Sequence, residues 1–212
     1  MSSKIGKTLA LGVMFTVASS VVRADNLIQG VFYENGEAVD VQPFSPAELQ
    51  EIANGVTALG GNGAGFLAAT TSGNLTVGLL APQPGIAGAH DSDTIGVNAS
   101  NMEAVDAIVK HEWQHVQNAQ AAGTSHDMGM KSSLSNPCGS ANHALLTAES
   151  ANDVCSLCTA DMTPDEKDAL RALFEDFTER AQNLMDEATF FGCPPVATPP
   201  ASTLIPPCEC LA

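Results

Sequence analysis

The sequence predicts an α+β protein in which a small twisted sheet packs on one long helix and is followed by a C-terminal helical part. Apolar residues alternate over 75–79, and a short apolar run at 94–98 indicates a second strand. Apolar residues at helical spacing predict three later helices, over about residues 101–122, 140–160 and 163–191. The predicted strands thus precede these helices, a segregation that is typical of α+β folds.

The first 24 residues have the features of a secretory signal peptide. Lys4 and Lys7 precede an apolar stretch over residues 9–22, which is too short to span a membrane comfortably. Small residues near Ala24 suit a signal peptidase, so we expect cleavage after Ala24 and a secreted or periplasmic protein. No other stretch is long and apolar enough for stable insertion into a membrane.

The chain is strongly acidic, with a net charge of −16. All 24 acidic residues follow residue 24, where only five basic residues remain. Binding of phosphate groups requires Lys and Arg, so this balance argues against nucleic acid as a partner. No pattern in the sequence indicates an oligomer.

Residues 25–192 are predicted to form one domain, and residues 193–212 form a Pro- and Cys-rich tail that disulfides tether. The six cysteines are an even set, which suits three disulfides in an oxidising compartment. Cys155-x-x-Cys158 could instead belong to a zinc site, but the spacing of Cys208-x-Cys210 fits neither a zinc finger nor a zinc ribbon.

The order of the cysteines suggests one pairing. If the two last predicted helices form an antiparallel hairpin, Cys193 returns near Cys138. This arrangement leaves four cysteines to hold the tail against the helix at 140–160: Cys155, Cys158, Cys208 and Cys210.

Shorter signals organise the N-terminal part. Ser45, Pro46 and Glu48 predict the start of a helix, with Ser45 as N-cap, proline at the first position and Glu48 at the third. The glycine-rich segment 60–65 lacks the lysine and the spacing of a phosphate-binding loop and is interpreted as a connector. Residues 66–99 are interpreted as β structure.

The helix predicted at about 101–122 carries the pentapeptide His111-Glu112-Trp113-Gln114-His115. Ser100 and Glu103 form a capping box at its start, and Gly123 supplies a stop at its end. Two imidazoles four residues apart lie on one face of a helix and can bind one Zn²⁺. The intervening Glu112 can then act as general base on water at the metal.

A catalytic zinc takes three protein ligands and keeps one position open for water, so a third ligand must come from elsewhere. The metzincin extension of the motif is absent, because Asn118 and Ala121 stand where it requires glycine and histidine. Five candidates remain from the residues alone: Glu149, Asp153, His126, His143 and His90.

The pentapeptide, on a helix entered from a short strand, resembles the zincin metallopeptidases. The downstream segment Glu149-Ser150-Ala151-Asn152-Asp153 is similar to the ExxxD segment of the gluzincin, or thermolysin-like, branch. The resemblance covers roughly residues 94–153. It implies that Glu149 is the third zinc ligand and that Asp153 lies behind His111 and accepts its other N–H.

The resemblance also implies a zincin-like fold, in which the substrate backbone lies antiparallel to an edge strand, here expected at 94–98 or 75–80. Zinc and Glu112 together predict hydrolysis of the bonds of a peptide or protein substrate. His143 and His126 are further candidates for stabilising the reacting oxyanion. Two alternatives stay open, a secreted disulfide-stabilised zinc-binding protein without catalysis and a metal-dependent hydrolase of non-peptide amides.

Overall fold

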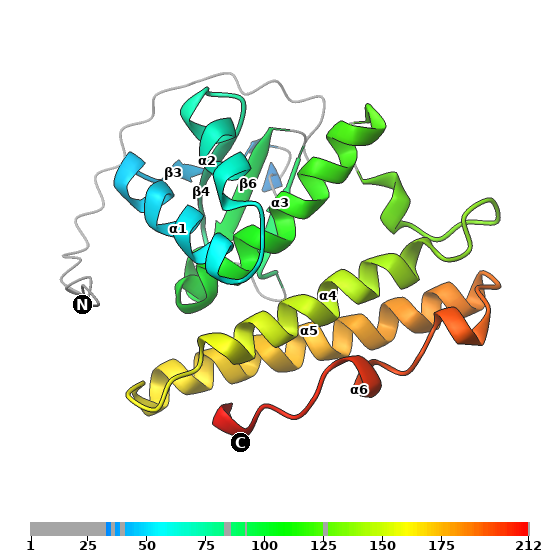
Figure 1. Ribbon diagram of the computed structural model, residues 1–212. Helices are drawn as coiled ribbons and strands as arrows, with labels where there is room; N and C mark the ends of the chain where they lie inside the picture. Colours follow the sequence, from blue (N-terminus) through cyan, green and yellow to red (C-terminus); the bar gives the residue numbers. More distant parts are fainter. Residues whose placement is uncertain are drawn as a thin grey trace.

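The computed structural model describes residues 33–34, 37–38, 41–82, 86–91, 93–124 and 127–211. The expected signal peptide and His126 lie outside these residues. Most of the described chain is helical, and a small mixed sheet lies in its N-terminal half, so the predicted α+β class is confirmed (Figure 1). No helix in this part of the chain combines the length and the apolar character that a membrane span requires.

The main sheet has four strands in the order β3 (Gln42–Pro43), β4 (Thr76–Leu80), β6 (Thr94–Asn98) and β5 (Gly88–His90). β4 and β6 run parallel, whereas β3 and β5 pair antiparallel with their neighbours at the two edges. A separate small sheet contains β1 (Tyr33–Glu34) and β2 (Glu37–Ala38). The strands predicted at 75–79 and 94–98 are present, but both lie inside the sheet, and the edge strand beside the motif helix is β5.

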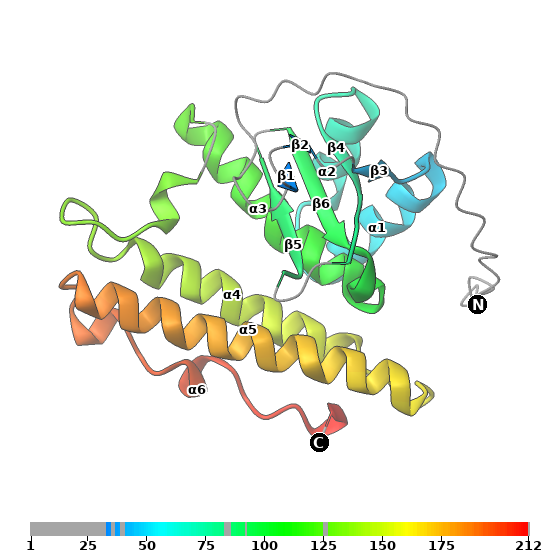
Figure 2. The same ribbon diagram turned by 180° about the vertical axis from the view of Figure 1, so that it is seen from behind.

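Two helices precede the second strand of the sheet, α1 (Pro46–Ala58) and α2 (Gly63–Thr71). The capping box predicted at Ser45 is confirmed, because the Ser45 amide donates to Glu48 Oε2 at 2.7 Å while Ser45 Oγ accepts from the Glu48 amide. The two helices lie against the same face of the sheet as the motif helix (Figures 1 and 2).

The prediction of β structure from residue 66 onward is wrong for α2. Asn62 Oδ1 accepts from the Gly65 amide at 2.9 Å and caps the helix. Gly63 lets α2 approach α1 closely, since a Cβ at this position would lie 2.0 Å from the carbonyl oxygen of Ala53. Phe66 is fully buried and its ring meets Trp113 edge-on, so tertiary packing decides the conformation of this segment.

The motif helix, α3 (Val105–Ala122), starts later than predicted. A 3₁₀ helix, η1 (Ala99–Ala104), comes first, and Asn98 caps it by accepting from the Ser100 amide at 3.0 Å. The capping box predicted from Ser100 therefore does not start α3. The predicted stop is confirmed, because Gly123 has a φ of 68°, a left-handed conformation that glycine adopts without strain.

The C-terminal half is a long hairpin of α4 (Gly139–Leu157) and α5 (Pro164–Phe190), which lie side by side and antiparallel (Figures 1 and 2). Thr163 and Glu166 form a second capping box at the start of α5. The tail then runs back along the hairpin through η3 (Pro195–Ala197), the single turn α6 (Ala201–Leu204) and η4 (Glu209–Leu211).

Three disulfides fix this arrangement, and they confirm that Cys138 pairs with Cys193 and that the tail is held to the end of α4, where the sequence leaves the individual pairs open. Cys138–Cys193 joins the start of α4 to the end of α5. The remaining bonds pin the tail to the end of α4: Cys155–Cys208 and Cys158–Cys210.

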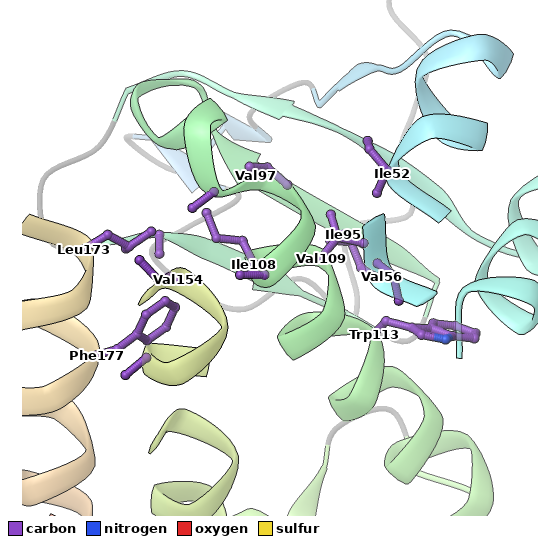
Figure 3. Close-up of a cluster of buried hydrophobic side chains, with 14 of the residues drawn as sticks. Ile52, Val56, Ile95, Val97, Ile108, Val109, Trp113, Val154, Leu173 and Phe177 are labelled. Carbon is purple, nitrogen blue, oxygen red and sulfur yellow. The ribbon is translucent and has the colours of Figure 1, made fainter. Parts of the chain in front are cut away.

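α3 lies between the sheet and the hairpin and packs on both (Figure 3). One continuous cluster of buried side chains joins α3 to four elements around it: Ile52, Val56, Ile95, Val97, Ile108, Val109, Trp113, Val154, Leu173 and Phe177. Packing on two sides fixes the rotation of α3 about its own axis, and this rotation decides which of its polar side chains face α4.

Candidate metal centre

The two motif histidines lie one turn apart on α3 and both are buried. Their Nε2 atoms are 3.2 Å apart. Zn–N bonds of about 2.0–2.1 Å in tetrahedral geometry place two ligand nitrogens about 3.3 Å from each other. The separation between His111 and His115 therefore suits a shared zinc ion.

The hydrogen bonds behind these rings set their tautomers. Ser150 Oγ donates to the Leu146 carbonyl at 3.0 Å, so it accepts from Nδ1–H of His111, 2.8 Å away. Nδ1–H of His115 donates to Asp127 Oδ2 at 3.2 Å. With both Nδ1 atoms protonated, both Nε2 atoms keep lone pairs, and these lone pairs face each other.

Burial lowers the pKa of both motif histidines, that of His111 well below its usual range. Both imidazoles are thus held neutral, which is the form that binds a metal ion. Two lone pairs this close without a proton between them repel, and a cation between them would remove the repulsion.

The third imidazole of the centre belongs to His143 on α4. The ligand atoms of the three histidines lie within 4.8 Å of one another. His143 Nε2 is buried and has no hydrogen-bond partner among the described residues, although buried polar atoms rarely lack one. Burial also lowers the pKa of His143, to about 3, so this ring is neutral as well.

A buried, unpartnered nitrogen beside two further lone pairs is the arrangement that a zinc ion completes. Neutral imidazoles suit Zn²⁺, Cu²⁺ and other borderline transition ions, so the donors alone fit zinc without excluding its neighbours in the series. Phe177 of α5 closes this side, with its ring centroid 5.8 Å from that of His111.

Glu112 lies beside the three histidines and is almost completely buried. His90 of β5 binds it, with Nδ1 2.6 Å from Glu112 Oε2. Burial by itself would raise the pKa of Glu112, but the hydrogen bond from His90 and the nearby imidazoles outweigh it and hold the pKa well below its usual range. The side chain is therefore a carboxylate.

The two acidic residues expected to serve the metal lie elsewhere. Lys110 Nζ binds Glu149 Oε1 and Asp153 Oδ2, each at 2.7 Å, and also the Leu59 carbonyl at 2.8 Å. Burial by itself would lower the pKa of Lys110, but the two carboxylates outweigh it and raise the pKa. The structure thus brings Glu149 and Asp153 to the lysine and not to the histidines.

Helix geometry explains this placement. Glu149 follows His143 by six residues, which is a rotation of about 240° around α4, so the two side chains leave the helix in different directions. Ser150 follows His143 by seven residues and returns to nearly the same face. Ser150 therefore stands behind His111, in the role expected of Asp153.

The sequence contained signals for both arrangements. The seven-residue spacing of His143 and Ser150 marks one helix face with a metal-binding and a hydrogen-bonding side chain. Lys110 lies on the buried face of α3 and needs an anionic partner, and Glu149 with Asp153 offers two carboxylates one turn apart. Asp127, which binds both His115 and Asn118, follows directly on the undescribed His126 and had no pattern to reveal it.

Comparison of the chain with models of known families, with curated proteins and with solved structures yields no match.

Proposed function

We propose that this chain is a secreted zinc-dependent metallopeptidase whose metal ligands are His111, His115 and His143. The observation that supports this most strongly is the buried, unpartnered Nε2 of His143 beside the paired motif histidines. Three histidines with one position left for water form a recognised class of catalytic zinc site. The proposal therefore keeps the zincin-like motif and replaces Glu149 by His143 as the third ligand.

A zinc ion bound there would supply a Lewis acid for a carbonyl oxygen and lower the pKa of a water molecule. Glu112 Oε2 is bound to His90, so its other oxygen is available to take a proton from that water. The same carboxyl group would pass the proton to the leaving amine. Burial of Glu112 excludes bulk water from this transfer.

The position of β5 supports a peptide as substrate. This strand is at the edge of the sheet, contacts α3, and pairs on one side only with β6 among the described residues. An extended peptide can add to such an edge through backbone hydrogen bonds. We therefore assign substrate binding to residues 88–90 and not to the interior strands at 94–98 or 75–80.

Export is supported by the signal-like sequence of the first 24 residues and by the disulfides. Disulfides persist in oxidising compartments and are rare in the cytosol.

A zinc-binding protein without catalysis is the second candidate, and the bond between His90 and Glu112 is what favours it. A carboxylate that is permanently engaged by a histidine could serve only to fix the strand on the helix.

One set of variants separates these functions. The mature chain should contain about one zinc, as a site of this class requires, and should cleave unstructured protein substrates. Glu112→Gln should keep the zinc and lose cleavage, whereas His143→Ala should lose the zinc. Glu149→Ala is the matched control and should keep both zinc and cleavage.

Zinc retained by His143→Ala and lost by Glu149→Ala would return the third ligand to Glu149. Stoichiometric zinc with no cleavage product from peptide libraries, detected by mass spectrometry, would leave the non-catalytic function.

A further inference from the structure

The hydrogen bond between β5 and Glu112 joins the edge of the sheet to the proposed general base. At 2.6 Å it is short even for a charge-assisted bond between an N–H and a carboxylate, which is about 2.7–2.9 Å long. An ionised carboxylate can only accept, so Nδ1 of His90 carries the proton. This contact connects two residues 22 positions apart in the chain, one on the strand and one on the helix.

The strand also restrains the rest of the Glu112 side chain. Gly88 faces α3 so closely that a Cβ there would lie 2.5 Å from Cγ2 of Ile108 and 3.4 Å from Cγ of Glu112. β5 is itself fixed by its register with β6, in which His90 lies opposite Ile95. The stem and one oxygen of Glu112 are therefore both held by one short, backbone-paired strand.

The ring of His90 makes a second contact, with the metal centre itself. It stacks on His115 with centroids 4.7 Å apart and planes inclined by 12°. The stack and the hydrogen bond are separate interactions, one made by the ring face and the other by Nδ1. Substitutions can therefore remove either of them alone.

We infer that His90 is a positioning residue for Glu112: its Nδ1–H holds Oε2 and thereby turns the other carboxylate oxygen towards the metal centre. The inference rests on the proposed function, because it gives the hydrogen bond a purpose in proton transfer. A general base must lie within hydrogen-bonding reach of its proton, and a glutamate side chain with three free torsions rarely holds that position unaided.

Two variants test the role of the hydrogen bond. His90→Asn removes the ring and keeps an N–H donor near the place of Nδ1, whereas His90→Phe keeps a ring for the stack and removes the donor. His90→Phe should lower kcat by about 100-fold, the loss expected when a catalytic group is misplaced by about 1 Å. His90→Asn should stay within about tenfold of the unmodified chain, as partial restoration of the position predicts.

KM and zinc content should change much less than kcat in both variants, because β5 would hold a peptide through its backbone groups and His90 is not one of the proposed metal ligands. A variant that merely unfolded the site would lose zinc and raise KM as well. Activity retained by His90→Phe and lost by His90→Asn would assign the effect to the stack and overturn the inference, as would equal loss in both.

A measurement that needs no activity examines the same bond. In ¹⁵N-labelled full-length mature protein, the side-chain NMR spectrum should show His90 with a proton on Nδ1, shifted downfield by the carboxylate. The signal should move upfield in Glu112→Ala. A proton on Nε2 alone, or a signal unaffected by Glu112→Ala, would overturn the inference even in an active enzyme.

The NMR result also separates this inference from the proposed function. A chain with the expected Nδ1–H signal and no hydrolysis in any assay disproves the peptidase and leaves the hydrogen bond as a structural link. A chain that hydrolyses peptides through Glu112 without the signal disproves the role of His90 alone.

Discussion

α3 carries polar groups on two neighbouring sides, and their hydrogen-bonding and charge requirements are met in different ways. On one side, Lys110 meets two carboxylates and a backbone carbonyl, so its charge and its donors are fully used. On the other side, the imidazoles of α3 and α4 present lone pairs to one another without a counter-ion. The charges of the first side are balanced within the polypeptide, whereas the second side has donor atoms that could hold a cation.

The two sides of α3 also differ in their exposure to solvent, and the lysine side is the more exposed. The lysine side borders a cavity of about 570 Å³, and the side chain of Glu149, which lines this cavity, is 57% exposed to solvent. The ligand nitrogens lie in the interior, where burial keeps the histidines neutral. A mutation on the lysine side should therefore change folding, and a mutation on the histidine side should change metal binding.

Lys110→Met and the loss of a disulfide are expected to have the largest effects on stability, and Lys110→Met tests the lysine side of α3. This change leaves Asp153 as an unpaired, largely buried carboxylate, which should lower the free energy of unfolding by about 3 kcal/mol. Glu149→Gln, at the exposed end of the same group, should cost less than about 1 kcal/mol. Urea unfolding of both variants measures the difference, and equal costs would contradict the description of Lys110 as the centre of this group.

Two disulfides that close loops of nearly equal length separate an effect on stability from an effect on zinc binding. Replacing Cys138 and Cys193, or Cys155 and Cys208, should lower stability by about 2–4 kcal/mol in each case, because the separations are 55 and 53 residues. Only the first pair lies next to His143, five residues along α4, so only its loss should weaken zinc binding. Equal loss of zinc affinity would show that α4 responds to the disulfides as a whole.

Ser150→Ala should act on the metal without a large effect on folding. It removes the acceptor for Nδ1–H of His111, and such changes typically lower metal affinity by about 10–100-fold. Ser156→Ala, at the exposed end of α4, is the control and should leave affinity unchanged. Competition with a chelating dye measures both, and equal affinities would mean that Ser150 does not hold the ring.

The smallest effect is a pH dependence of the metal-free protein. Burial lowers the pKa values of His111, His115 and His143 below the ordinary 6.5, so they stay neutral in the fold while the unfolded chain binds protons. Stability should therefore fall as the pH drops below about 6.5, by less than about 1 kcal/mol per histidine between pH 7 and 6. Denaturant titrations of the metal-free protein at pH 7 and pH 6 measure this fall, and equal stability at the two pH values would contradict it.

Local signals predicted the parts of the fold that depend on near neighbours in the chain. The cap at Ser45 and the stop at Gly123 involve contacts within a few residues, and both are present. The segment 66–71 was assigned to β structure because its packing on α1 and Trp113 is invisible in its own sequence. α3 starts later than predicted because Asn98 caps a 3₁₀ helix, which comes before α3.

The candidate site likewise has one part that near neighbours in the sequence predict and one part that depends on contacts between distant residues. The pair His111 and His115 follows from the period of one helix, and the structure keeps both nitrogens together. The third ligand depends on the rotation of α4 against α3, which their mutual packing sets. Glu149 and His143 were both plausible along the chain, and Lys110, one residue before the motif, determined which way Glu149 points.

The disulfide at the end of the hairpin also implies that the candidate metal centre forms late in folding. His143 stands on a helix braced by α5 and by Cys193, so the three imidazoles converge only after nearly the whole chain is available. Under the proposed export and function, a protein that crosses the membrane N-terminus first would complete its metal centre only after the last helix has crossed. Its proposed hydrolytic activity would then arise outside the compartment of synthesis.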